Sequence, residues 1–338
     1  MTKMSAGLST KLAKFRASPE TFFADSRNAV VRTLGLSLVP RLEASELISA
    51  MLEDPSEALR ERELPVIRDW IRHRELARAR ARQRRLALAG HPRVSVVMAA
   101  WNAEDCIESA MGSVLNQSYS ALELIVVDDA SQDATREIVQ KMAAKDPRVK
   151  LVRNGRQRGA AMSRNVGLTH ASGAYLTFQD ADDISHLERI ERQLAALLSR
   201  PDALFCICNY RRETPEGKRV VINGRRFGKS LISMLIPRDP VFERVGYMCD
   251  LRVGEDSEYY QRIRATFGAR SELHLFQTLY RARYAVGSLL FSHGATTETN
   301  GAVTYVQSPI AREAYERAIE RIDTMRRGEI SPFVAFDG

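Results

Sequence analysis

The amino-acid sequence predicts an α/β protein whose central sheet is mostly parallel and has helices on both faces. Two observations support this class: short strands alternate with helices from residue 93 onward, and the strands are too uniformly apolar to have a solvated face. Polar residues also follow several strands directly, where such sheets bind ligands. The expected parts are a basic helical extension at residues 1–90, an α/β domain at 91–295 and a helical tail at 296–338.

The composition is that of a globular protein. The chain has 338 residues, 44% of them hydrophobic, which allows one large domain with its own core and an appendage. Its four cysteines are scattered, so we expect no disulfide framework and infer a reducing, cytoplasmic environment. No apolar run is long enough to span a membrane, and we find no hydrophobic leader.

The formal net charge of +8 is concentrated in one segment of the N-terminal extension. Residues 60–85 hold ten arginines and four acidic residues, with apolar side chains at helical spacing. A basic helix would suit nucleic acid, an anionic membrane surface or an acidic partner, and equally a solvated helix packed on the domain. The arginines are not accompanied by an aromatic ladder, so we do not expect nucleic-acid binding.

Strands and helices alternate in order along the α/β domain. Apolar runs predict strands at residues 94–98, 122–127, 149–152 and 175–178. Helical spacing predicts helices at residues 104–116, 134–144, 160–169 and 187–198. Because a helix separates each strand from the next, the strands should be parallel and their carboxyl ends should meet at one edge of the sheet.

Polar residues follow the first two strands at that edge. Ala99, Trp101 and Asn102 come after the first strand, and Asp128 and Asp129 come after the second. Taken alone, the aspartate pair would most simply cap the next helix. Together with the other clusters at the same edge, it favours contact with the base or ribose of a nucleotide.

Residues 173–183, GAYLTFQDADD, form a short strand that ends in three carboxylates, Asp180, Asp182 and Asp183. Like charges this close repel each other unless a cation lies among them, and hard oxygen ligands favour Mg²⁺ or Mn²⁺ over zinc. A solvated acidic turn before the next helix is the alternative for this run alone. The clusters that follow the first two strands at the same edge of the sheet favour the metal site over this alternative.

The chain resembles the family 2 glycosyltransferases of the GT-A fold in three ordered motifs, VSVVMAAWNAEDCIESAMGSVLNQSYSALELIVVDDASQDAT, GRQRGAAMSRNVGL and GAYLTFQDADD. The resemblance covers residues 93–290. It implies a donor half at 93–183 and an acceptor half at 184–295. It also implies that Asp129 contacts the uracil of a nucleotide sugar and that Trp101 packs on the base.

The resemblance further implies a metal and a catalytic base. Asp182, supported by Asp180, would hold Mn²⁺ or Mg²⁺ on the donor diphosphate, and Arg158 or Arg164 would add positive charge there. Asp256 would take the proton of the acceptor hydroxyl in an inverting transfer. A charge cluster that balances the dipole of a helix N-terminus is the alternative for Asp256, and a surface position is the alternative for Arg164.

The chain departs from the family pattern at two positions. Ala100 stands where the family commonly has Pro, and Ala285 stands where related enzymes often have a His near the metal. His293 is therefore a candidate metal ligand, with a structural role as the alternative. The QxxRW signature of processive enzymes does not occur where it would be expected, which favours transfer of a single sugar.

The predicted function is inverting, divalent-metal-dependent transfer of one sugar, by resemblance UDP-linked, to a hydroxyl of a glycan or lipid-linked oligosaccharide in bacterial surface polysaccharide synthesis. The segment KLAKFRASPETFFADSRN resembles a leader of capsule and surface-polysaccharide enzymes, which suggests peripheral binding to the inner membrane face. Two alternatives stay open. A sugar nucleotidyltransferase should have a Gly-rich basic loop after the first strand, unlike AAWNAEDC, and a non-catalytic scaffold would bind membrane partners through its arginines.

Overall fold

The computed structural model describes residues 76–224, 227–284, 294–299 and 302–336. The chain divides into two compact units, residues 1–84 with 276–278, and residues 85–275 with 279–338. Residues 76–88 form a helix, and the rest of the predicted N-terminal extension lies outside the described residues. No helix among the described residues is long and apolar enough to cross a membrane. The predicted division at residues 90 and 295 stays a prediction.

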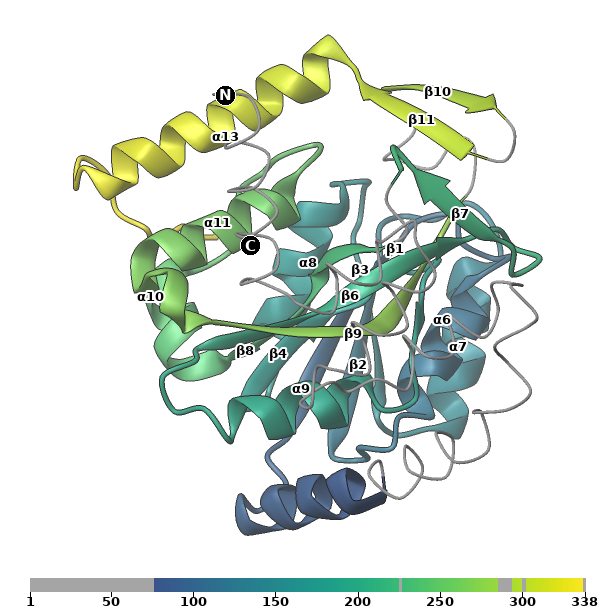
Figure 1. The fold of residues 1–338 in the computed structure, drawn as a ribbon. Helices are drawn as coiled ribbons and strands as arrows, with labels where there is room; N and C mark the ends of the chain where they lie inside the picture. The colour runs from purple at the N-terminus through teal and green to yellow at the C-terminus, as the bar shows by residue number, and fades with distance from the viewer. Residues whose placement is uncertain (1–75, 225–226, 285–293, 300–301, 337–338) are drawn as a thin grey trace, which may run out of the picture. The chain divides into compact units, whose positions relative to one another are not determined.

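The sheet of the second unit has a parallel core (Figure 1). Parallel pairs join β1 (Val94–Ala100) to both β2 (Leu122–Asp128) and β4 (Tyr175–Phe178), and β2 to β3 (Val149–Arg153). All four predicted strands and their parallel pairing are therefore confirmed. Every residue of β2 is buried, as expected for a strand that is covered on both faces.

Beyond β4 the sheet is mixed, because most of the strand pairs there are antiparallel. These strands are β5 (Ile184–Ser185), β6 (Phe205–Glu213), β7 (Arg219–Ile222), β8 (Gly228–Pro237), β9 (Glu272–Arg283), β10 (Gly294–Thr299) and β11 (Ala302–Gln307). β8 pairs antiparallel with β4 and β6, whereas β11 pairs parallel with β7. The C-terminal segment is not helical throughout, since β11 precedes α13 (Pro309–Arg326).

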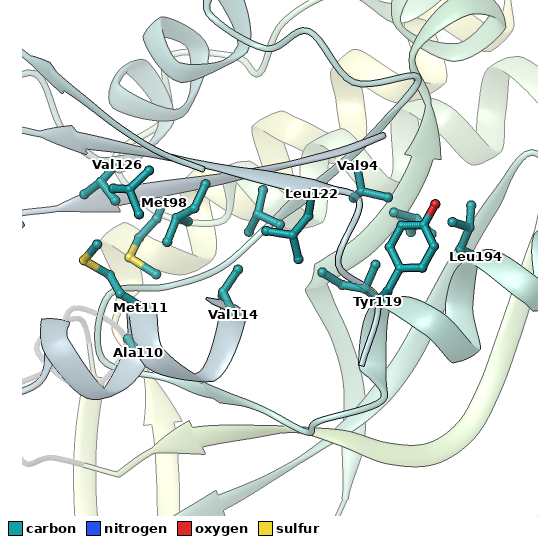
Figure 2. Packing of buried hydrophobic residues seen from close by; sticks show 14 of the residues in the cluster. Val94, Met98, Ala110, Met111, Val114, Tyr119, Leu122, Val126 and Leu194 are labelled. Atoms are coloured by element: carbon teal, nitrogen blue, oxygen red, sulfur yellow. The ribbon is translucent and has the colours of Figure 1, made fainter. Parts of the chain in front are cut away.

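Helices cover both faces of the parallel core, as the sequence predicts. One face carries α6 (Ile107–Leu115), α7 (Thr135–Lys145) and α9 (Arg189–Leu197), and the other carries α8 (Ala160–Thr169), α10 (Glu243–Val245) and α11 (Glu255–Phe267). Alternate residues of β1 serve the two cores, with Met98 on the α6 side and Val97 on the α8 side. Figure 2 shows Met98 and Val126 of the sheet opposite Met111 of α6.

Helix α8 approaches the sheet closely because Gly167 has no side chain. A methyl group at this position would overlap Cγ1 of Val97 in β1 and would lie 3.2 Å from Cγ2 of Val127 in β2. Replacing Gly167 with Ala is therefore expected to lower the free energy of unfolding by about 1–3 kcal/mol, through overpacking. Urea denaturation followed by circular dichroism measures this change.

Gly112 in α6 provides a matched control for that substitution. A methyl group there would meet no atom within 4 Å, so Gly112→Ala should raise the free energy of unfolding by up to about 1 kcal/mol through helix propensity alone. Equal effects at the two glycines would contradict the close approach of α8 to β1.

Candidate active site

The acidic turn after β4 is held in place by two buried side chains, Gln179 and Tyr280. Nε2 of Gln179 donates to the backbone carbonyl of Asp183 at 2.8 Å, and its Oε1 accepts the Ser185 hydroxyl at 2.6 Å. The hydroxyl oxygen of Tyr280, in β9, accepts the backbone N–H of Asp180 at 3.0 Å. These contacts fix the backbone of the turn from inside the protein.

The carboxylates of the turn have different surroundings. Asp183 is buried, and its Oδ1 accepts the backbone N–H of Arg283 at 2.8 Å. This contact indicates a structural role for Asp183 within the turn. Burial, with the charge of Asp180, raises the pKa of Asp182 to about 6. The ionised form of Asp182 is therefore disfavoured beside Asp180, and a bound cation would stabilise both carboxylates in their ionised form.

Arg164 connects this turn with the start of α11. It lies in α8 and is 5% exposed. Its Nη2 donates to Oδ1 of Asp180 at 2.6 Å, and its Nη1 forms an ion pair with Glu255. Burial opposes the charge on the guanidinium, but the carboxylates of Asp180, Glu255 and Asp256 keep the pKa of Arg164 above its ordinary value. The predicted surface alternative does not apply, because Arg164 is buried.

Helix α11 brings Asp256 to the same region. The helix begins after Gly254, whose φ is +81°, and its first turn holds Glu255, Asp256 and Glu258. The positive end of the helix dipole favours these charges. Burial and the neighbouring charge of Glu255 raise the pKa of Asp256 to about 6, although Arg164 acts in the opposite direction. A carboxylate with a pKa near neutrality is well suited to general-base catalysis.

Asp129 fixes the loop that leads into α8. Its carboxylate accepts Nδ2 of Asn154 at 2.7 Å and the backbone N–H groups of Arg158 and Gly159, both at 2.8 Å. The residue is 3% exposed. A carboxylate offers about four lone-pair sites, so one acceptor position is left for a ligand such as the imide N–H of uracil. The predicted contact with uracil stays a prediction.

The loop after β1 packs on the loop after β2. The backbone N–H of Asn102 donates to the Ser131 hydroxyl at 3.1 Å, and Oδ1 of Asn102 accepts the backbone N–H of Gln132 at 2.9 Å. Trp101 is 51% exposed, so its indole has open surface for a planar ligand. Ala99 was predicted to follow the first strand, but it lies within β1, one residue before its end. Trp101, Asn102 and Asp129 therefore belong to loops at one edge of the sheet, and Ala99 lies near the end of β1 at the same edge.

The acidic turn fits a divalent cation that is shared with a ligand. Mg²⁺ in nucleotide sites is usually held by one or two carboxylates, and phosphate and water oxygens complete its octahedron. Asp180 and Asp182 supply two such groups. Within the described ranges no three His, Cys, Asp or Glu side chains form a metal-binding group. His293, the predicted further ligand, and Ala285 lie outside the described residues.

Three residues that hold the site together were not predicted from the sequence. Asn154, Gln179 and Tyr280 are buried polar side chains whose partners come from other elements. The one signal in the sequence for Gln179 is its place between a buried strand and the carboxylates. All four cysteines are free thiols, as expected.

The mixed sheet, with helices on both faces and an acidic turn after β4, is the GT-A fold. A solved structure, Staphylococcus aureus TarS 1-349 in complex with UDP-GlcNAc, resembles it with a TM-score of 0.50 and 21% sequence identity, over 60% of this chain and 62% of that chain. Residues 95–249 match the family described as Glycosyl transferase family 2. The chain thus carries a glycosyltransferase domain of family 2.

Two curated bacterial relatives support this assignment. The Escherichia coli UDP-Glc:alpha-D-GlcNAc-diphosphoundecaprenol beta-1,3-glucosyltransferase WfgD is 34% identical over 156 residues, 46% of this chain and 57% of WfgD. The putative teichuronic acid biosynthesis glycosyltransferase TuaG of Bacillus subtilis is 41% identical over 109 residues, 32% of this chain and 43% of TuaG. The chain therefore spans about half the length of these relatives.

Proposed function

We propose that this protein transfers one sugar from a UDP-linked donor to a hydroxyl group of a glycan or lipid-linked oligosaccharide, with inversion, in bacterial surface polysaccharide synthesis. The observation that carries this proposal is the bridge from Asp180 through Arg164 to Glu255, which joins the acidic turn to the helix of Asp256. The name of WfgD supports a UDP-sugar and a lipid-linked acceptor.

In this reaction Asp256 accepts the proton of the acceptor hydroxyl while that oxygen attacks the anomeric carbon of the donor. The bond between the anomeric carbon and the donor diphosphate breaks, and the nucleoside diphosphate leaves with the electron pair. A single base on the acceptor side suffices for inversion, because the attack and the departure occur on opposite faces of the sugar. Arg164 pairs with Glu255, so the charge beside Asp256 is partly balanced.

The acidic turn would hold the metal ion of this reaction. Asp182 would be the main ligand and Asp180 the supporting one, with Mn²⁺ or Mg²⁺ as the ion. Such an ion, when bound, supplies several kcal/mol of charge stabilisation to the departing diphosphate. Asp183 would stabilise the backbone of the turn, because its carboxylate accepts the backbone N–H of Arg283.

The raised pKa of Asp256 predicts the pH dependence of the reaction. The base must be ionised, and burial places its pKa at about 6, so kcat/KM should rise with pH and level off above that value. The rate should fall about tenfold for each pH unit below it. Initial rates at saturating metal, from about pH 5 to 8, measure the profile. A profile that is flat through pH 6 would argue against Asp256 as the base.

A transfer assay tests the proposed function. The protein is incubated with an α-linked UDP-sugar, Mn²⁺ and a lipid-linked N-acetylglucosamine acceptor, and the product is examined by NMR. We expect a product in which the new glycosidic bond is β-linked. An α-linked product would refute inversion, and the absence of transfer from every UDP-sugar would refute the donor class. Attachment to vesicles that carry the acceptor would test the proposed peripheral membrane location.

A further inference from the structure

The chain that follows α13 returns to the segment between α10 and α11. The backbone N–H of Val334 donates to the carbonyl of Val245 at 3.0 Å, and the N–H of Tyr247 donates to the carbonyl of Val334 at 2.9 Å. Gly246 lies between these two contacts, with φ at +66°, and a Cβ there would collide with the Val334 carbonyl. We call residues 331–336 the C-terminal strap.

A buried arginine anchors the strap to α11. The side chain of Arg262 is 0% exposed and forms an ion pair with Glu258, with Nε 2.8 Å from Oε1. Its Nη1 donates to the carbonyl of Pro332 at 3.2 Å, and its Nη2 donates to the carbonyl of Tyr247 at 2.7 Å. The strap is therefore tied to the helix that carries Asp256.

The last residue of the strap, Phe336, contacts Tyr247 and the loop that leads into α8. The ring of Phe336 lies 5.2 Å from the ring of Tyr247, measured between centroids. Cζ of Arg158 lies 5.5 Å from the centroid of the Phe336 ring, which is the geometry of a cation–π contact. The backbone N–H of Arg158 donates to Asp129, so one residue joins the strap to the loop of the predicted uracil contact.

Of the two arginines considered for the phosphates, Arg158 is the better placed. Arg164 is buried and is engaged by Asp180 and Glu255. Arg158 is partly exposed and directly precedes Gly159, the N-cap residue of α8. The N-terminus of α8 has no side-chain cap, and the first turn of the helix has no acidic residue. The positive end of a helix and a neighbouring guanidinium both favour an anion.

We propose that Phe336 is a positioning residue for donor binding, which holds the guanidinium of Arg158 toward the diphosphate of the nucleotide sugar. This inference rests on the proposed function, because it needs a nucleoside diphosphate donor. The ring restricts the long side chain of Arg158 before the donor arrives, so less conformational entropy is lost on binding. The ring of Phe336 contacts the guanidinium of Arg158 and not the backbone N–H that binds Asp129, so recognition of the uracil should not change when the ring is removed.

The test compares the affinities of UDP and of uridine for four forms of the full chain, measured by competition against a fluorescent UDP-sugar with Mn²⁺ present. Phe336→Leu keeps the apolar packing and removes the aromatic face, so the Kd for UDP should rise about 3- to 20-fold while the Kd for uridine stays within about twofold. Phe336→Tyr should restore UDP affinity to within about twofold of the wild type. Phe333→Ala, in the same strap with its ring 46% exposed, is the control that should leave both affinities unchanged.

A double-mutant comparison identifies the partner of the ring. Arg158→Gln should raise the Kd for UDP about tenfold or more, and adding Phe336→Leu to it should cause no further loss. Equal losses for UDP and uridine, or full additivity of the two changes, would overturn the positioning role of Phe336. If the wild-type chain binds no UDP, the proposed donor fails and this inference fails with it. If the wild type binds UDP and Phe336→Leu binds it equally well, the inference alone fails.

Discussion

Replacing Asp256 with Asn is expected to lower turnover about 10²- to 10⁴-fold, with donor affinity nearly unchanged. The amide has almost the same shape as the carboxylate, but it does not accept the proton of the acceptor hydroxyl. Because that proton transfer belongs to the transition state, the loss should appear in kcat and not in the Kd of the donor. Steady-state kinetics together with UDP titration measure the two quantities separately.

Asp250 provides the control for this variant. It lies in the loop before α11 and its side chain is exposed, so Asp250→Asn should leave turnover within about twofold of the wild type. Normal turnover in Asp256→Asn would show that another group is the base. A parallel loss of UDP affinity would show that Asp256 acts on the donor and not on the acceptor.

Replacing Asp182 with Ala is expected to abolish the gain in UDP affinity that Mn²⁺ provides. Asp182 is the proposed main ligand. The loss of Mn²⁺-dependent UDP affinity in this variant should therefore exceed the roughly 10- to 100-fold loss typical of residues that only support a ligand. Isothermal titration calorimetry of UDP with and without Mn²⁺ measures this gain. In the wild type the two titrations should differ strongly, and in Asp182→Ala they should coincide.

The matched control is Asp202→Ala, because Asp202 is an exposed carboxylate that pairs with Arg200 on the surface. This variant should keep the full effect of Mn²⁺. If Asp182→Ala also kept it, the acidic turn would not be the metal site. Loss of the Mn²⁺ effect in both variants would point to a general charge effect instead of a ligand.

The strands of the donor half could be predicted because each is specified locally. β1, β2 and β4 are short apolar runs, and the pattern depends only on neighbouring residues. The start of α6 was predicted too early, since the structure begins it at Ile107 and not at residue 104. The backbone N–H groups of Ala103 and Glu104 donate to the side chains of Thr135 and Asp133, which follow β2 in the chain. These hydrogen bonds hold residues 103 and 104 in the loop before α6.

The contacts within the site could not be predicted, because they join distant parts of the chain. Arg164 and Glu255 are 91 residues apart, and nothing in either local sequence identifies the other as its partner. The same holds for Asp129 and the N–H groups of Arg158 and Gly159. The sequence pattern predicts that the carboxylates lie at the ends of strands. The tertiary fold determines which cations and hydrogen-bond donors contact them.

Neither member of the aspartate pair caps the next helix, because the N-cap of α7 is Ala134 and no side chain caps it, but Asp128 does make a local contact. Its Oδ1 accepts the backbone N–H of Ser131 at 3.0 Å, which is a local turn contact. Asp133 likewise accepts the N–H of Thr135 at 3.0 Å, at the start of α7. One member of the pair therefore stabilises the turn, and its neighbour Asp129 reaches across to α8. The sequence offered no basis for separating the two.

The most direct test of the account is nucleotide release from a panel of sugar donors, measured with and without Mn²⁺. The panel holds UDP-glucose, UDP-galactose, their N-acetyl forms and UDP-glucuronic acid, with GDP-mannose as the control for the nucleotide. We expect release of UDP from at least one UDP-sugar when Mn²⁺ is present, a large decrease when the ion is removed with a chelator, and no release from GDP-mannose. Release from no UDP-sugar, or equal release with and without the ion, would contradict it.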